Sequence, residues 1–258
     1  MVRTMVMIHG MFGGSWCWEN YRGFFGRRGY RCLAPALRHH DVDPKGAPHP
    51  ELGTVSLLDY ADDLERMIRG LDEKPVLIGH SMGGLITQIL GSRKLGSALV
   101  LLASAAPAGI SAITPSVMKS ISTEMIEWGF WRKPIKSTFE STSYSAMHLL
   151  PEAERRAAYG RYVHDSGRAF FEIGFSFLDP RKAASIDERK IDDPMLVVVG
   201  AEDRITPASV NLRIARKYKG YATYMEFPRH AHWIFGEPGW ERVAASIHGW
   251  LNDSEKGG

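Results

Sequence analysis

Residues 75–84 read Pro-Val-Leu-Ile-Gly-His-Ser-Met-Gly-Gly, and this stretch is the strongest indication of the fold. An apolar run leads into a Gly-x-Ser-x-Gly pattern, and apolar residues at helical spacing follow from Leu85. This order is typical of a buried strand that turns sharply into a helix with a serine at the turn. Glycine is needed on both sides of the serine because a β-carbon there would crowd the strained backbone. The stretch therefore predicts a nucleophile elbow that presents the Ser81 hydroxyl above the edge of a sheet.

A serine hydroxyl is a weak nucleophile at neutral pH, so the elbow requires a histidine base and a carboxylate that orients it. Residues 195–207 read MLVVVGAEDRITP: a β-branched run, a turn with two acids, and a helix start with Thr206 as the expected N-cap. Asp203 is thus expected at the carboxyl end of a buried parallel strand, where α/β sheets place their chemistry. The next strand, 222–227, leads into a loop that carries His230 and His232.

Three motifs make the chain resemble the α/β-hydrolase superfamily: Ser81 in Gly-His-Ser-Met-Gly-Gly, Asp203 in Gly-Ala-Glu-Asp-Arg-Ile-Thr-Pro, and His232 in His-Trp-Ile-Phe-Gly-Glu-Pro. A fourth, His-Gly-Met-Phe-Gly-Gly-Ser-Trp at 9–16, resembles the oxyanion loop of the plant methylesterase and hydroxynitrile lyase branch. Together the motifs span nearly the whole chain. The resemblance implies an α/β-hydrolase fold, with a doubly wound and mostly parallel sheet of about six strands that begins at the family's third strand.

The pattern of apolar runs supports that architecture. Strands are expected at about 4–9, 30–34, 75–80, 97–103, 194–200 and 222–227, each apolar throughout, as in a parallel sheet buried on both faces. A helix with an amphipathic stripe is expected at about 56–70, and Ser56 can cap its N-terminus. Residues 1–106 and 191–258 should form the hydrolase core.

Residues 107–190 are not needed by such a sheet, and their position matches the helical cap of the superfamily. Val117, Met118, Ile121, Met125 and Trp128 recur at helical spacing, and Tyr159, Tyr162 and Val163 lie on a second candidate helix. The aromatic residues of this segment imply a largely hydrophobic pocket, because part of its inner face must line the site. As substrate contacts we expect Phe12 and two cap residues, Trp128 and Trp131.

The resemblance also assigns roles within the site. Ser81 is the nucleophile, His232 the base and Asp203 the orienting acid, and the backbone N–H groups of Met11 and Met82 form the oxyanion hole. Phe12 is the alternative to Met11. Two further alternatives are Glu202, beside the acid, and His230, two residues before the base. The family's Asp-Arg-Ile-Thr-Pro and Ala-His-Trp usage favours Asp203 and His232. His9 and His80 are read as structural.

Composition limits the remaining functions. A chain of 258 residues with 44% hydrophobic content can bury one large core. The net charge of +3 is small, and the scattered Lys and Arg residues predict no nucleic-acid partner. No apolar run reaches the roughly 18 residues of a membrane span, and the first strand begins too early for a signal peptide. Cys17 and Cys32 fit no redox or metal spacing, which favours reduced thiols in the cytoplasm. The oligomeric state is left open.

Neither a metal nor another cofactor is expected. His39, His40, Asp41 and His49 lie in a Pro-rich loop, but their spacing is not that of metal ligands. The triad chemistry itself requires no cofactor.

The sequence therefore predicts a serine hydrolase that cleaves carboxylic esters of small to medium apolar substrates through an acyl-enzyme. A lactonase or a carbon–carbon bond hydrolase remains an alternative because either can use the same triad. Hydroxynitrile lyases of the similar branch carry a threonine beside the His-Gly loop and a lysine near the histidine. Here Met11 stands in place of the threonine and Trp233 in place of the lysine, which disfavours a lyase. A ligand receptor on the same fold is disfavoured because the triad is intact.

Overall fold

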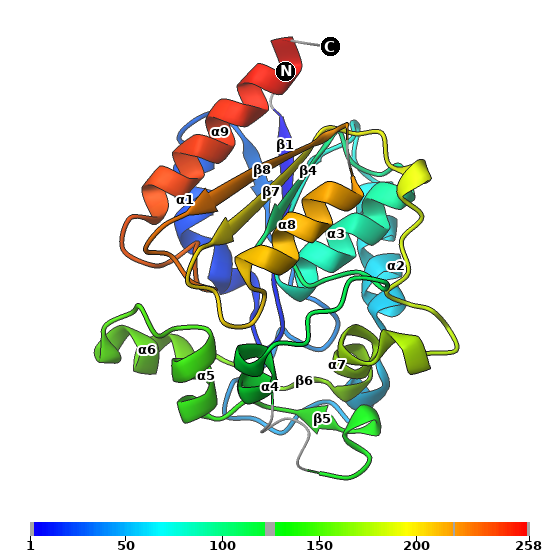
Figure 1. Cartoon of the computed structure of the whole chain (residues 1–258), viewed down its shortest axis with the longest axis vertical. Coiled ribbons are helices and arrows are strands. Elements are labelled where there is room, and N and C mark those ends of the chain that lie inside the picture. Colours follow the sequence, from blue (N-terminus) through cyan, green and yellow to red (C-terminus); the bar gives the residue numbers. More distant parts are fainter. Residues whose placement is uncertain (1–2, 122–126, 219, 257–258) are drawn as a thin grey trace.

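A parallel six-stranded sheet forms the centre of the computed structural model, which describes residues 3–121, 127–218 and 220–256 (Figure 1). The strand order is β2-β1-β3-β4-β7-β8, and every neighbouring pair is parallel. The strands are β1 (Thr4–Ile8), β2 (Arg31–Leu33), β3 (Val76–His80), β4 (Ala98–Leu102), β7 (Met195–Gly200) and β8 (Ala222–Phe227). The predicted sheet is confirmed, and all six expected strands are present.

Helices cover both faces of this sheet. On one face lie α1 (Glu19–Gly26) and α9 (Trp240–Lys256), and on the other α2 (Leu57–Ile68), α3 (Met82–Ser92) and α8 (Ala208–Lys217) (Figure 1). Each face buries its own apolar cluster, one centred on α2 and α3 and one on α1 and α9. Burial on both faces holds only for the four inner strands, because β2 and β8 lie at the edges and are partly exposed. For the edge strands that prediction was wrong.

Local sequence signals explain where two helices begin. Ser56 caps α2, as the sequence predicted, and the structure adds a capping box with Asp59. The helix α8 begins at Ala208 with Pro207 at its N-cap, so Thr206 is not the cap. The expected role of Thr206 was wrong: its hydroxyl faces the Asp203 carboxylate and the Ala103 carbonyl instead of the first turn of α8.

Most of the segment between β4 and β7 lies beyond the carboxyl ends of the strands, and its last part runs back beside the core to the start of β7 (Figure 1). Its elements are α4 (Pro115–Ile121), β5 (Pro134–Ile135), α5 (Phe139–Ser145), α6 (Glu152–Tyr159), β6 (Asp165–Ser166) and α7 (Gly167–Gly174). The strands β5 and β6 form an antiparallel pair. We call residues 107–190 the cap, and their separation from the core stays a proposal. Met125 of the first expected cap helix lies outside the described residues, and Tyr162 and Val163 follow α6 without belonging to it.

Short 3-10 turns join these elements, at η1 (Ser15–Trp18), η2 (Leu52–Thr54), η3 (Phe130–Arg132), η4 (Ser176–Leu178) and η5 (Glu188–Lys190). Within the described ranges, no helix combines the length and the apolar character needed to cross a membrane.

Candidate active site

Ser81 occupies the sharp turn between β3 and α3. Its backbone has φ 53° and ψ −120°, a left-handed conformation that non-glycine residues rarely adopt. A β-carbon on Gly79 would lie 2.1 Å from the Gly83 carbonyl oxygen, and one on Gly83 would lie 2.1 Å from the Ile8 carbonyl oxygen. The chain can therefore pass through this turn only with glycine on both sides of the serine. This is the geometry that the Gly-x-Ser-x-Gly pattern predicts.

The loops after β7 and β8 bring a carboxylate to an imidazole. The Nδ1 atom of His232 lies 2.8 Å from Asp203 Oδ2, and both residues are buried. Asp203 Oδ1 accepts the backbone N–H groups of Ile205 and Thr206, each at 2.8 Å. Burial alone would raise the pKa of Asp203, but the adjacent His232 and the Thr206 donors hold it below its usual value of 3.8. The carboxylate therefore stays ionised and can fix the orientation of the imidazole.

Thr206 is a member of this site that sequence reasoning missed. Its hydroxyl donates to Asp203 Oδ2 at 2.8 Å and lies 3.3 Å from His232 Nδ1. The Ala103 carbonyl, at the end of β4, lies 2.9 Å from the same hydroxyl. The Asp-Arg-Ile-Thr-Pro motif places Thr206 three residues after Asp203, which could have identified it as a partner of the acid. A threonine before proline also fits a helix cap, however, and that interpretation was preferred.

The two alternatives to the acid and the base lie in other surroundings. Glu202 is exposed, whereas Asp203 is 5% exposed. His230 is buried with its Nδ1 3.3 Å from Glu237 Oε2, which also accepts the Ala231 N–H at 2.8 Å. Ser81 and His232 both line one cavity of about 100 Å³, and His230 does not line it. The geometry thus favours Asp203 and His232 as partners of Ser81.

Residues of both the core and the cap line this cavity. Met11 and Phe12 lie on its wall, as do Tyr162 and Phe170 of the cap. Hydroxyl groups from the cap also border it, on Ser120, Ser137, Thr142 and Ser145. The wall is otherwise largely apolar, which agrees with the predicted character of the pocket.

The two tryptophans expected at the pocket do not line the cavity. Trp128 is 87% exposed, so this prediction was wrong. Trp131 was also placed wrongly: its ring packs against Trp128, Phe130 and Phe171, in an apolar cluster that borders the cavity wall without lining it. Sequence periodicity could not distinguish an inward from an outward aromatic residue in this irregular segment.

The oxyanion loop follows β1 and offers backbone donors. The Phe12 N–H donates to Asp165 Oδ2 at 2.8 Å and is therefore already bound. Within the described part of the chain, the N–H groups of Met11 and Met82 donate no hydrogen bond to protein. The Met82 N–H also stands at the N-terminus of α3, where the helix dipole favours negative charge. Met11 lines the cavity together with Ser81, and Met82 follows Ser81 in the chain. That these two N–H groups form the oxyanion hole stays a prediction.

Two buried histidines brace this region in their neutral forms. His9 Nδ1 donates to the Gly10 carbonyl at 2.8 Å, and its Nε2 accepts the Leu37 N–H at 3.0 Å. Burial, aided by the nearby His40, lowers the pKa of His9 to about 3. His80 donates from Nε2 to the His232 carbonyl at 2.9 Å, and burial holds its pKa well below 6.5. Both histidines thus have the structural role expected from the sequence.

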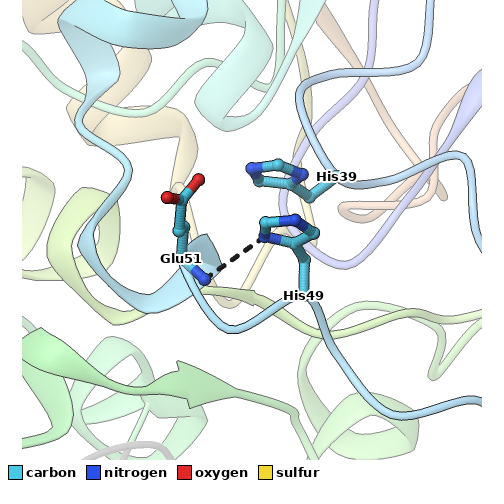
Figure 2. A group of neighbouring side chains, drawn as sticks. All are labelled: His39, His49 and Glu51. Carbon is cyan, nitrogen blue, oxygen red and sulfur yellow. Dashed lines mark hydrogen bonds between the residues drawn. The ribbon is translucent and has the colours of Figure 1, made fainter.

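A separate cluster lies on the loop between β2 and α2. Figure 2 shows His39, His49 and Glu51, whose potential ligand atoms all lie within 4.8 Å of one another. The two imidazole rings stack with centroids 3.7 Å apart and planes 5° apart, and His49 Nδ1 accepts the Glu51 N–H at 3.2 Å. Parallel stacked rings direct their nitrogen lone pairs side by side, so the rings would have to separate before both could bind one ion. The expectation that no metal is required stays a prediction.

Known proteins place this geometry in context. The model of the alpha/beta hydrolase family matches residues 5–246. A monoacylglycerol lipase from Mycolicibacterium smegmatis is 25% identical over 264 residues, which cover 96% of this chain and 87% of the lipase. Methylesterase 8 from Arabidopsis thaliana is 32% identical over 91 residues, which cover 34% of this chain and 32% of the methylesterase. The chain thus spans about a third of the length of the methylesterases it matches.

Solved structures agree over the whole chain. A methylesterase from Arabidopsis superposes with a TM-score of 0.73 at 15% identity, covering 97% of this chain and 99% of the other. A pyrethroid hydrolase from Sphingobium faniae gives 0.73 at 19% identity, covering 98% of each chain. At such identities the likeness concerns the fold alone. With the family model matched from the first strand into the last helix, the chain belongs to the alpha/beta hydrolase family.

Proposed function

We propose that this protein hydrolyses carboxylic esters of small to medium apolar substrates through an acyl-enzyme formed on Ser81. One observation carries the proposal: a strained serine and a histidine bonded to a buried carboxylate line the same small cavity. The relatives named above as methylesterases and as a monoacylglycerol lipase support ester substrates.

The residues divide the chemistry between them. His232 removes the proton from the Ser81 hydroxyl as its oxygen attacks the ester carbonyl, and Asp203 stabilises the resulting imidazolium. The N–H groups of Met11 and Met82 donate to the oxyanion that forms. His232 then protonates the departing alcohol, and water attacks the acyl-enzyme by the same route. The chemistry needs no metal and no cofactor.

A series of p-nitrophenyl esters from acetate to octanoate, with lactones alongside, tests the substrate class. Because the cavity wall is largely apolar, each added methylene should raise kcat/KM by up to about fourfold, which corresponds to about 0.8 kcal/mol per buried CH₂. The gain should stop within the series because the cavity is small. A flat profile would show that the acyl chain does not enter it. Faster turnover of lactones than of any linear ester would favour the lactonase alternative.

A further inference from the structure

Phe12, the residue after Met11, is bound to the cap through both polar groups of its backbone. Its N–H donates to Asp165 Oδ2 at 2.8 Å, and its carbonyl accepts the Val163 N–H at 3.0 Å. Phe12 has φ 63°, which is unfavourable for a bulky side chain. Such a backbone persists only where its surroundings over-determine it. The cap supplies two of the contacts that do so.

Asp165 is itself held from several elements. Its Oδ2 also lies 3.0 Å from His40 Nε2, and its Oδ1 accepts the Ser166 N–H at 2.6 Å and the Tyr60 hydroxyl at 3.3 Å. His40 Nδ1 lies 2.9 Å from the Arg38 carbonyl oxygen, so both ring nitrogens face acceptors. Asp165, Tyr60 and Ser166 are fully buried, and His40 is 3% exposed. His40 and Asp165 thus form a buried, hydrogen-bonded pair beside the oxyanion loop.

This pair acts next to the peptide group that carries the Met11 N–H. His9 holds the Gly10 carbonyl of that peptide group, and the trans geometry directs the Met11 N–H to the opposite side. Asp165 holds the next peptide group through the Phe12 N–H. With both peptide planes fixed, the Met11 backbone between them keeps little freedom to rotate.

We propose that Asp165, held by His40 and Tyr60, is a positioning residue that aims the Met11 N–H at the oxyanion. The inference rests on the proposed function, because it assigns Asp165 to the same reaction. Asp165 does not line the described cavity, so it acts through the loop without contact with the substrate. The cap thereby contributes to the chemical step in addition to covering the site.

Asp165→Asn tests the inference, with Glu172→Gln as the matched control. Glu172 is a second fully buried carboxylate of the cap that binds the core, but it contacts Ser56 and Leu57 at the start of α2, and Arg168 of its own helix α7. We expect Asp165→Asn to lower kcat by about tenfold to hundredfold, with KM within about threefold of wild type. The loss should stay below the roughly 10²-fold to 10³-fold cost of removing an oxyanion donor. Glu172→Gln should lower stability while kcat stays within about threefold.

A second readout separates positioning from general damage. A trifluoromethyl ketone, which forms a tetrahedral adduct with a serine nucleophile, should bind Asp165→Asn more weakly by the same factor as kcat falls, whereas the product alcohol should bind equally. Should Asp165→Asn fail to fold, Tyr60→Phe removes one donor from the same carboxylate and should lower kcat at least about twofold. Equal kcat in the Asp165 and Glu172 variants, or an unchanged Tyr60→Phe, would overturn the inference. Ester hydrolysis by the wild-type protein tests the proposed function separately. The inference about Asp165 depends only on the kcat of each variant relative to that of the wild type.

Discussion

At the residue scale, the site depends on how one carboxylate is kept ionised inside the protein. Asp203 is 5% exposed, and a carboxylate in that position would be neutral without donors around it. Two backbone N–H groups, the Thr206 hydroxyl and His232 supply them. An anion held in this way fixes His232 in the tautomer whose Nε2 is free to accept a proton. In the proposed mechanism, the geometry around Asp203 is therefore what allows His232 to act as the base.

The two histidines of the last loop should differ sharply in importance. His232→Ala should lower kcat by about 10³-fold or more, because the base is lost and the serine reverts to a weak nucleophile. His230→Ala should lose far less, because His230 contacts Glu237 and does not line the cavity. Steady-state kinetics on one ester, with circular dichroism to check folding, measures both variants. The reverse ranking of the two kcat values would transfer the role of base to His230.

At the element scale, the loop between β8 and α9 contains a carboxyl group that is poorly suited to carry charge. Glu237 is 1% exposed, and within the described residues its Oε1 has no hydrogen-bond partner. Burial, opposed in part by the Ala231 N–H, raises the pKa of Glu237 from 4.5 to about 7. The same carboxyl group fixes the backbone one residue before His232. The loop between β8 and α9 is therefore anchored by the Glu237 carboxyl group, whose pKa lies near neutral pH.

This anchor should make stability depend on pH. The unfolded chain releases the Glu237 proton near pH 4.5 and the folded protein near pH 7, so the folded protein binds more protons between these values. Stability should therefore fall as pH rises through that window, by about 3 kcal/mol at most. Glu237→Gln should remove this fall, and urea unfolding of both proteins at pH 5 and pH 8 measures it. Parallel pH profiles would contradict the assignment.

Most of the helices and strands that position the site could be predicted from the sequence. The six strands, the capped helix α2 and the elbow follow from apolar runs, a serine before an amphipathic stripe, and paired glycines, all of which are local signals. The triad positions follow from motif order. The role of Thr206 was predicted wrongly because a threonine before proline can either cap a helix or donate a hydrogen bond to a neighbouring side chain. The exposure of the edge strands was missed because the order of strands in a sheet cannot be read from the sequence. The prediction that the cap tryptophans line the pocket was wrong for a different reason. An irregular segment has no periodicity that distinguishes inward from outward side chains.

At the scale of the whole molecule, the proposed mechanism requires the fold to favour one hydroxyl among several as the nucleophile. The cavity wall also carries Cys17 and the hydroxyl groups of Ser120, Ser137, Thr142 and Ser145. Burial raises the pKa of the Cys17 thiol to about 12, which leaves little thiolate at neutral pH. Ser120 and Ser145 donate their hydroxyls to backbone carbonyls. Ser81 alone among these groups lies at the elbow, where a strand end, a helix N-terminus and the His232 loop meet.

Labelling with an alkyl phosphonate fluoride tests whether Ser81 is the activated nucleophile. The reagent reacts with a serine that is activated by a base and faces an oxyanion hole, so it reports on the assembled site. Mass spectrometry of the labelled protein should show one adduct on the peptide that contains Ser81, formed in parallel with the loss of ester hydrolysis. Ser81→Ala should remain folded, take up no label and turn over esters about 10³-fold more slowly or worse. An adduct on another residue, or ester hydrolysis within tenfold of wild type in Ser81→Ala, would contradict the account.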